Sequence, residues 1–176
     1  MSLNNPEEEV IRFQSGDITA LEEIYQYYKQ PLYRFIYRLT ANQQLSIDVV
    51  QDTFEKLQRK KHQYDPAKGK FNTYLYQIAY NTVMTKLKRE RRFEAFFPFL
   101  VQKHPPPSIS QEDKLTIQEA VQKLPEDLRA VIVLTYYHDL PQKEIACIMG
   151  IPAGTVKSRL FRALRKLKKD LGVEEA

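Results

Sequence analysis

The chain has 176 residues, of which 43% are hydrophobic and 28% are charged, and its formal net charge is +5. This balance is typical of a soluble, folded protein with one medium domain or two small ones, and it excludes a disordered chain. The excess of positive charge is compatible with a polyanionic partner. A single cysteine, Cys147, excludes an internal disulfide and a zinc site built from several cysteines.

No catalytic or metal-binding pattern is recognisable in the sequence. The three histidines, His62, His104 and His138, lie far apart and lack ligand spacing. There is no glycine-rich phosphate loop and no Ser/His/Asp or Cys/His set. We therefore expect no enzymatic activity, no metal and no cofactor. Without a signal pattern or an apolar run near the roughly 20 residues that span a bilayer, we expect a cytoplasmic protein that does not insert into membranes.

The spacing of apolar residues predicts an all-α fold of two small helical domains joined by a flexible linker. The first long helix should cover about residues 18–40, with Asp17 as its N-cap. Pro31 should kink or split it. A second helix should begin at Ser46 and turn four apolar side chains inward: Ile47, Val50, Phe54 and Leu57.

The second predicted helix also carries a stripe of acidic and amide side chains beside its apolar seam. These residues are Asp48, Gln51, Asp52 and Glu55. Carboxylates repel phosphate, so in a basic protein the stripe is either an ordinary solvated face or a surface that meets a basic protein.

Residues 64–70, "YDPAKGK", have the composition of a loop, and a third helix should run from Asn72 to about Arg92. Its outward arc is predicted to hold Tyr74, Gln77, Tyr80, Asn81, Met84 and Lys88. Aromatic rings with amide and basic neighbours suit unstacked bases. The alternative is that individual tyrosines pack against neighbouring helices.

The segment 93–110, "FEAFFPFLVQKHPPPSIS", contains four prolines and no helical period, and we interpret it as a linker. It separates a unit of residues 1–92 from a unit of residues 111–176. Four of its side chains are too apolar for a solvated tether and should pack on a domain or a partner: Phe96, Phe97, Phe99 and Leu100. Ser110 and Asp113 resemble a capping box at the start of the second unit.

The segment "PQKEIACIMGIPAGTV" predicts a helix-turn-helix. Ala146 allows close helix approach, Gly150 provides the turn and Val156 anchors the second helix. The following "KSRLFRALRKLKK" places its leucines on one arc and its cations on the rest, with no acid among them. The start of such a helix can enter the major groove of DNA. The alternative is a solvated helix in a helical hairpin.

Together these motifs resemble bacterial RNA polymerase sigma factors of the extracytoplasmic-function (ECF) group. The resemblance rests on "SIDVVQDTF", on "YDPAKGKFNTYLYQIAYN" and on the segment from "LPEDLRAV" to "RALRKL", in that order. It implies that unit 1–92, similar to sigma region 2, binds core RNA polymerase and melts the −10 promoter element. Unit 111–176, similar to sigma region 4, would read the −35 element. It also implies an anti-sigma factor as a partner.

The resemblance assigns roles to individual residues. Those implied to bind core polymerase are Asp48, Gln51, Asp52 and Phe54. Those implied to bind the −10 element are Tyr64, Lys68, Phe71, Asn72, Tyr74, Gln77, Tyr80 and Asn81. Those implied to bind the −35 element are Lys143, Thr155, Lys157, Ser158, Arg159, Phe161 and Arg162. The alternative function is a stand-alone helix-turn-helix regulator with an N-terminal sensor or dimerisation domain.

Overall fold

The protein is described by a computed structural model that places residues 6–96 and 116–172. Within these ranges every regular element is a helix, which confirms the predicted all-α class. The first unit contains α1 (Pro6–Gln14), α2 (Ile18–Thr40), α3 (Gln43–Arg59), the short turns η1 (Lys61–Gln63) and η2 (Pro66–Lys68), and α4 (Phe71–Phe96). The second contains α5 (Ile117–Gln122), α6 (Glu126–Ile132), the π-helical turn η3 (Val133–Tyr137), α7 (Gln142–Met149) and α8 (Ala153–Asp170).

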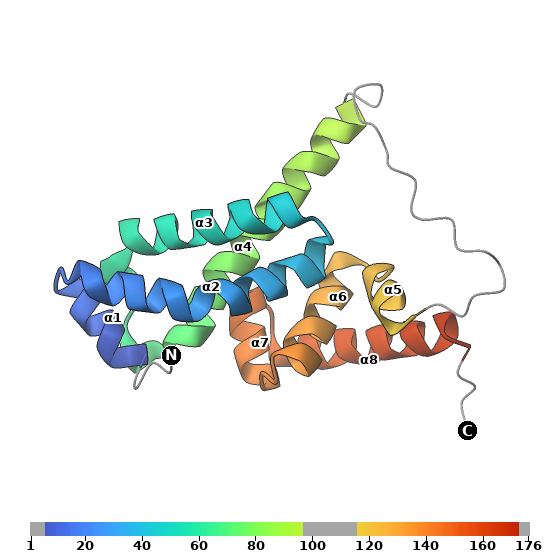
Figure 1. The fold of residues 1–176 in the computed structure, drawn as a ribbon. Coiled ribbons are helices and arrows are strands. Elements are labelled where there is room, and N and C mark those ends of the chain that lie inside the picture. The colour runs from blue at the N-terminus through green and yellow to red at the C-terminus, as the bar shows by residue number, and fades with distance from the viewer. Residues whose placement is uncertain (1–5, 97–115, 173–176) are drawn as a thin grey trace.

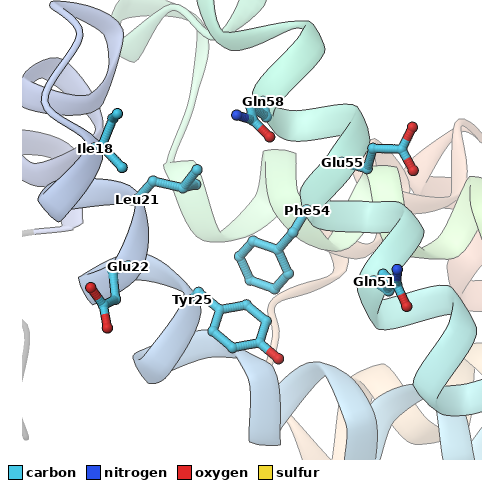
Figure 2. Close-up of a pocket in the computed structure, with 8 residues that line it drawn as sticks. All are labelled: Ile18, Leu21, Glu22, Tyr25, Gln51, Phe54, Glu55 and Gln58. Atoms are coloured by element: carbon cyan, nitrogen blue, oxygen red, sulfur yellow. The ribbon is translucent and has the colours of Figure 1, made fainter.

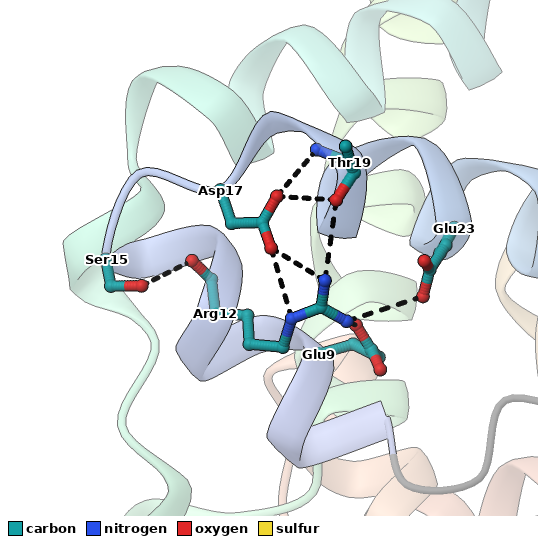
Figure 3. A network of polar contacts seen from close by, with 6 residues as sticks. All are labelled: Glu9, Arg12, Ser15, Asp17, Thr19 and Glu23. Atoms are coloured by element: carbon teal, nitrogen blue, oxygen red, sulfur yellow. Dashed lines mark hydrogen bonds and ion pairs between the residues drawn. The ribbon is translucent and has the colours of Figure 1, made fainter.

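Helix α2 begins where the sequence predicts. The side chain of Asp17 accepts a hydrogen bond from the backbone N–H of Thr19 at 2.9 Å, as an N-cap should. The same carboxylate binds Arg12 at 2.7 Å, and this guanidinium also reaches Glu9 at 2.6 Å, so one charged cluster joins α1 to α2 (Figure 3). α2 then continues without a break through Pro31, so the helix is not split there.

Helix α3 begins at Gln43, with Asn42 as its cap, three residues before the predicted start. The prediction that Ile47 points inward is wrong, because its side chain is 45% exposed. Two polar residues, Ser46 and Thr53, are instead fully buried. Each hydroxyl donates to the carbonyl four residues earlier, at 2.6 and 2.7 Å, so burial leaves neither unpaired. The buried face is thus rotated away from Ile47.

Helix α4 runs to Phe96, four residues beyond the predicted end at Arg92. Phe96 is 75% exposed and does not pack on the described part of the protein. Phe97, Phe99 and Leu100 and the expected Ser110–Asp113 capping box lie outside the described residues. A capping box is present six residues later, where Thr116 and Glu119 exchange hydrogen bonds at the start of α5.

The two units pack directly against each other, with α7 lying on α4 (Figure 1). One small apolar cluster is internal to the second unit and includes Leu124, Leu128 and Leu167. The larger cluster is shared by both units, since Ile145 and Ile148 of α7 belong to the same core as residues of α2 and α4. We call the surface where α7, η3 and α6 meet α2 and α4 the seam.

Candidate functional site

The predicted acidic face lies on α3 beside a shallow pocket formed with α2 (Figure 2). The pocket has a volume of about 390 Å³ and is lined by Ile18, Leu21, Glu22, Tyr25, Gln51, Phe54, Glu55 and Gln58. Its floor is aromatic, because the rings of Tyr25 and Phe54 meet edge to face at 4.9 Å. Sequence reasoning identified Gln51 and Phe54 but missed the α2 side of this pocket. The sequence signal was the apolar Ile18 directly after the predicted cap Asp17; in the structure Ile18 is 80% exposed at the first position of α2.

The two aspartates of this face are half-buried and have partners within the first unit. Gln44 donates to Asp48 at 3.0 Å, one turn earlier on the same helix. Asp52 forms an ion pair with Lys86 of α4 at 2.9 Å. Asp52 therefore has a structural contact in addition to its predicted role, and any test of that role must separate the two.

The loop before α4 is built on two aromatic residues that lie inside the core. Phe71 is fully buried, with its ring 5.3 Å from that of Tyr64 and 5.6 Å from that of Tyr28. Tyr64 is 5% exposed, its hydroxyl donates to the carbonyl of Gly69, and burial raises its pKa. As placed here, these two predicted DNA-binding residues position the loop and do not face solvent.

The remaining predicted residues of this loop are more accessible. Lys68 is exposed, and Asn72 and Tyr74 are half-buried. The ring of Tyr74 lies 5.4 Å from that of Tyr64, and burial raises the pKa of its hydroxyl. An aromatic side chain held in this way, with part of its surface open, can stack on a base.

Further along α4, the arc that was predicted to face outward is partly covered, and one of its residues contacts the second unit. Tyr80 is only 8% exposed, so the prediction that it faces solvent is wrong in this arrangement. Gln77 donates from Nε2 to the backbone carbonyl of Cys147 in α7 at 3.0 Å. Asn81 alone of these three is exposed. Tyr76, which sequence reasoning did not select, is buried and forms a 3.1 Å hydrogen bond with His138.

The helix-turn-helix forms as the sequence predicts. Gly150 ends α7 in the left-handed conformation with φ of 64°, which favours glycine. The backbone N–H of Ile151 donates to the carbonyl of Ala146 at 3.1 Å and closes the turn. Val156 is fully buried and fixes α8 against α7.

The predicted −35 face is open over most of its area. Five of its seven residues are exposed: Lys143, Lys157, Ser158, Phe161 and Arg162. Thr155 is half-buried, and Arg159 is partly occupied by an ion pair with Asp127 at 3.4 Å. The start of α8 therefore presents cations and hydroxyls together, which are the groups that contact phosphates and the edges of guanine.

Comparisons with known proteins identify both units. Residues 24–93 match the family described as Sigma-70 region 2, and residues 114–167 match Sigma-70, region 4. The ECF RNA polymerase sigma factor SigW of Bacillus subtilis (strain 168) is 31% identical over 89% of this chain and 91% of its own length. The RNA polymerase sigma-H factor of Pseudomonas aeruginosa is 31% identical over 92% of this chain and 91% of its own.

Two solved structures share the fold. The sigma factor RpoE of Bartonella quintana, in complex with the anti-sigma factor NepR, has a TM-score of 0.73 at 22% identity, covering 90% of this chain and all of that one. CnrH, in complex with the cytosolic domain of CnrY, has a TM-score of 0.70 at 23% identity, covering 95% of this chain and 97% of that one.

The two matched regions define a protein built from sigma regions 2 and 4. The chain belongs to the ECF family of bacterial RNA polymerase sigma factors. It is a transcription initiation factor that directs RNA polymerase to promoters, and proteins of this class are in general not catalysts. No helix among the described residues is both long and apolar enough to cross a membrane.

Proposed function

We propose that the first unit binds core RNA polymerase through the α2–α3 pocket and the acidic face beside it. The residues in contact would include the predicted Asp48, Gln51, Asp52 and Phe54. The single observation that carries this proposal is that an aromatic pocket, lined by the exposed carboxylates of Glu22 and Glu55, lies beside the half-buried Asp48 and Asp52 on a protein of net charge +5. Such a surface fits a partner segment with apolar side chains in its centre and basic ones around them.

The two DNA contacts follow from the other two faces. We propose that the loop of residues 64–70 and the first turns of α4 hold the −10 element as a separated strand. Tyr74 and Asn72 would meet the bases, Lys68 the backbone, and Tyr64 and Phe71 would support the loop from inside the core. The exposed residues at the start of α8, with Lys143, would read the −35 element as duplex DNA. The limits of the units, residues 1–92 and 111–176, and of the linker, residues 93–110, remain predictions.

The polymerase contact is tested by reversing charge on α3. The variant with Asp48→Lys and Asp52→Lys should bind core polymerase at least about tenfold more weakly, since like charges then face the basic partner. Pull-down with core polymerase and runoff transcription measure the loss, and circular dichroism with thermal melting checks the fold. Full holoenzyme assembly by a folded double variant would refute the proposal.

A matched control separates binding from the structural role of Asp52. Exchanging the pair, with Asp52→Lys and Lys86→Asp, keeps an ion pair between α3 and α4 but puts the cation on α3. This variant should fold like the unchanged protein and still bind polymerase weakly. If the exchange restores binding together with stability, the effect of Asp52 is structural.

We further propose that the chain has no catalytic activity of its own and that an anti-sigma factor regulates it. Support comes from the two solved structures of the same fold, RpoE with NepR and CnrH with CnrY. A gel-shift experiment distinguishes the alternative of a stand-alone regulator. Tight duplex binding by the free chain would favour that alternative, whereas a sigma factor requires core polymerase.

A further inference from the structure

Gln14, the last residue of α1, is bonded to the segment that leads into the loop of residues 64–70. We propose that Gln14 is a positioning residue for the −10 strand. Its amide fixes the backbone of Tyr64, and Tyr64 holds Tyr74, which is proposed to meet the bases. This role rests on the proposed function of the loop. Because α1 precedes residues 24–93, the part that matches region 2, the role extends the −10 surface beyond that region.

One side-chain nitrogen holds both ends of the turn η1. Nε2 of Gln14 donates to the carbonyl of Lys61 at 2.7 Å and to that of Tyr64 at 2.8 Å. A side-chain amide nitrogen carries two hydrogens, so a single glutamine can make both bonds at once. Lys61 begins η1 and Tyr64 directly follows it. The two bonds therefore fix the backbone that connects α3 to the loop.

The donor of these bonds lies on a helix that is itself firmly held. Val10 and Phe13 of α1 are 1% and 5% exposed and belong to the same core as Tyr28 and Phe71. On the solvent side, the cluster around Arg12 joins α1 to α2 (Figure 3). A carbonyl bonded to the end of such a helix takes a defined position, as a side chain does when its supporting contacts are complete.

Tyr64 connects Gln14 to both ends of the loop. Its ring lies 5.3 Å from that of Phe71 and 5.4 Å from that of Tyr74, at the start of α4. Its hydroxyl donates to the carbonyl of Gly69 at 3.1 Å. A displacement of the Tyr64 backbone would therefore move the carbonyl of Gly69 and the ring of Tyr74 together.

The contacts of the Gln14 amide are confined to one of the three proposed surfaces. Both of its acceptors belong to the segment before α4. The α2–α3 pocket is lined only by α2 and α3, and the −35 face is formed by α7 and α8. Loss of the amide should therefore weaken binding of the −10 strand and leave the other two functions intact.

The test measures three functions of the same holoenzyme. Gln14→Met keeps the length of the side chain but removes both donors. A fluorescent, single-stranded −10 oligonucleotide, taken from a promoter that the unchanged holoenzyme transcribes, should bind at least about fivefold more weakly by anisotropy. Pull-down of core polymerase and filter binding of a −35 duplex should each change by less than about twofold, and circular dichroism checks the fold.

Two further variants separate the loss of the donors from other effects. Gln14→His places an N–H as many bonds from the backbone as Nε2 of glutamine, so it can restore one of the two bonds and should bind the strand with intermediate affinity. Gln118→Met makes the same substitution at an exposed position of α5, outside the proposed surfaces, and should change none of the three functions.

A second measurement follows the loop without DNA. Backbone amides of residues 61–70 should exchange hydrogen at least about fivefold faster in Gln14→Met, whereas those of α8 should keep their rates. Equal exchange in this segment would overturn the positioning role. Equal loss of strand, duplex and core binding would also overturn it, because that pattern indicates a general loss of structure.

The variant Tyr74→Ala distinguishes this role from the proposed function on which it rests. Strand binding that is lost in Tyr74→Ala but unchanged in Gln14→Met would overturn the role of Gln14 alone. Strand binding that survives both substitutions would instead count against the proposed function of the loop. Loss of strand binding in both variants, with core and duplex binding retained, is the expected result.

Discussion

Lowering the pH should open the seam, because a neutral histidine is buried in it. His138 follows η3 and packs against the first unit, with its ring 5.6 Å from Phe35 and 5.2 Å from Tyr76. Its Nδ1 shares a hydrogen bond with the hydroxyl of Tyr76, whereas Nε2 is buried without a partner. Burial, and then the nearby charge of Arg38, lowers the pKa of His138 from 6.5 to about 4, and the carboxylate of Asp139 acts in the opposite direction.

The direction and size of the effect follow from this pKa. Between pH values of about 6.5 and 4, molecules in which the seam has opened and exposed the imidazole take up a proton that closed molecules, with a packed seam, exclude. The stability of the packed seam is therefore complete above the higher value and is lost as the pH falls. Between about pH 7.5 and 5.5, the ratio of open to closed molecules should rise about tenfold. The lower pH is one unit below the unperturbed pKa of 6.5, so proton uptake by the exposed imidazole favours the open molecules by about a factor of ten.

A donor and an acceptor dye attached at Lys60→Cys and Lys169→Cys, in a Cys147→Ser background, measure this ratio by single-molecule energy transfer across the pH range. Removing the titrating group with His138→Gln should abolish most of the pH response in this interval. Nuclear magnetic resonance of the imidazole should show a pKa well below the ordinary value in the free protein. A normal pKa, or an equal pH response in the glutamine variant, would refute the reasoning.

Three further predictions concern stability and DNA binding. Arg129 donates to three backbone carbonyls, one in α2, one in α5 and one in the turn after α5. Arg129→Met should therefore lower the free energy of unfolding by about 2–4 kcal/mol in a urea titration, and Arg129→Lys should lower it by less. The pKa of Asp17 is lowered to about 2, chiefly by its hydrogen bond from Thr19 and then by Arg12. The carboxylate therefore stabilises the fold fully above its ordinary pKa of 3.8, and this stabilisation is lost as the pH falls toward 2. Asp17→Asn should therefore flatten the fall of the melting temperature in that interval, and an unchanged slope would contradict the assignment. Arg162→Ala, at an exposed position, should leave melting unchanged but weaken holoenzyme binding to a −35 duplex by about 1–3 kcal/mol in a filter-binding assay.

Local patterns in the sequence were sufficient to predict most of the helices. The Asp17 cap, the Gly150 turn and the buried Val156 each depend on residues within one or two helical turns. Errors arose where a hydrogen bond from its side chain allows a polar residue to be buried. Ser46 and Thr53 can be buried because their hydroxyls donate to backbone carbonyls four residues earlier, and a hydrophobicity pattern therefore places the core face too close to Ile47.

The seam could not be predicted from local patterns. Its hydrogen bonds join residues that are far apart in the chain, such as Tyr76 and His138, 62 positions apart, or Lys70 and Glu144, 74 positions apart. On a helical wheel Glu144 resembles an ordinary acid in a helix first turn, and Gln77 resembles an ordinary solvated amide. The choice between a tyrosine that packs and one that meets DNA was left open by the sequence, and for Tyr80 the packed state is the one observed.

The C-terminal end of α2 is completed by residues of the other unit. Gln122 donates to the carbonyl of Arg38 at 2.8 Å, and Arg129 donates to that of Leu39, two carbonyls that a helix end leaves without intrahelical partners. The first unit on its own would have to turn these groups to water, only a few residues before Asn42 caps α3. Separation of the units would thus loosen the turn between α2 and α3. Faster hydrogen exchange of the backbone amides around Thr40 would detect that event without any attached dye.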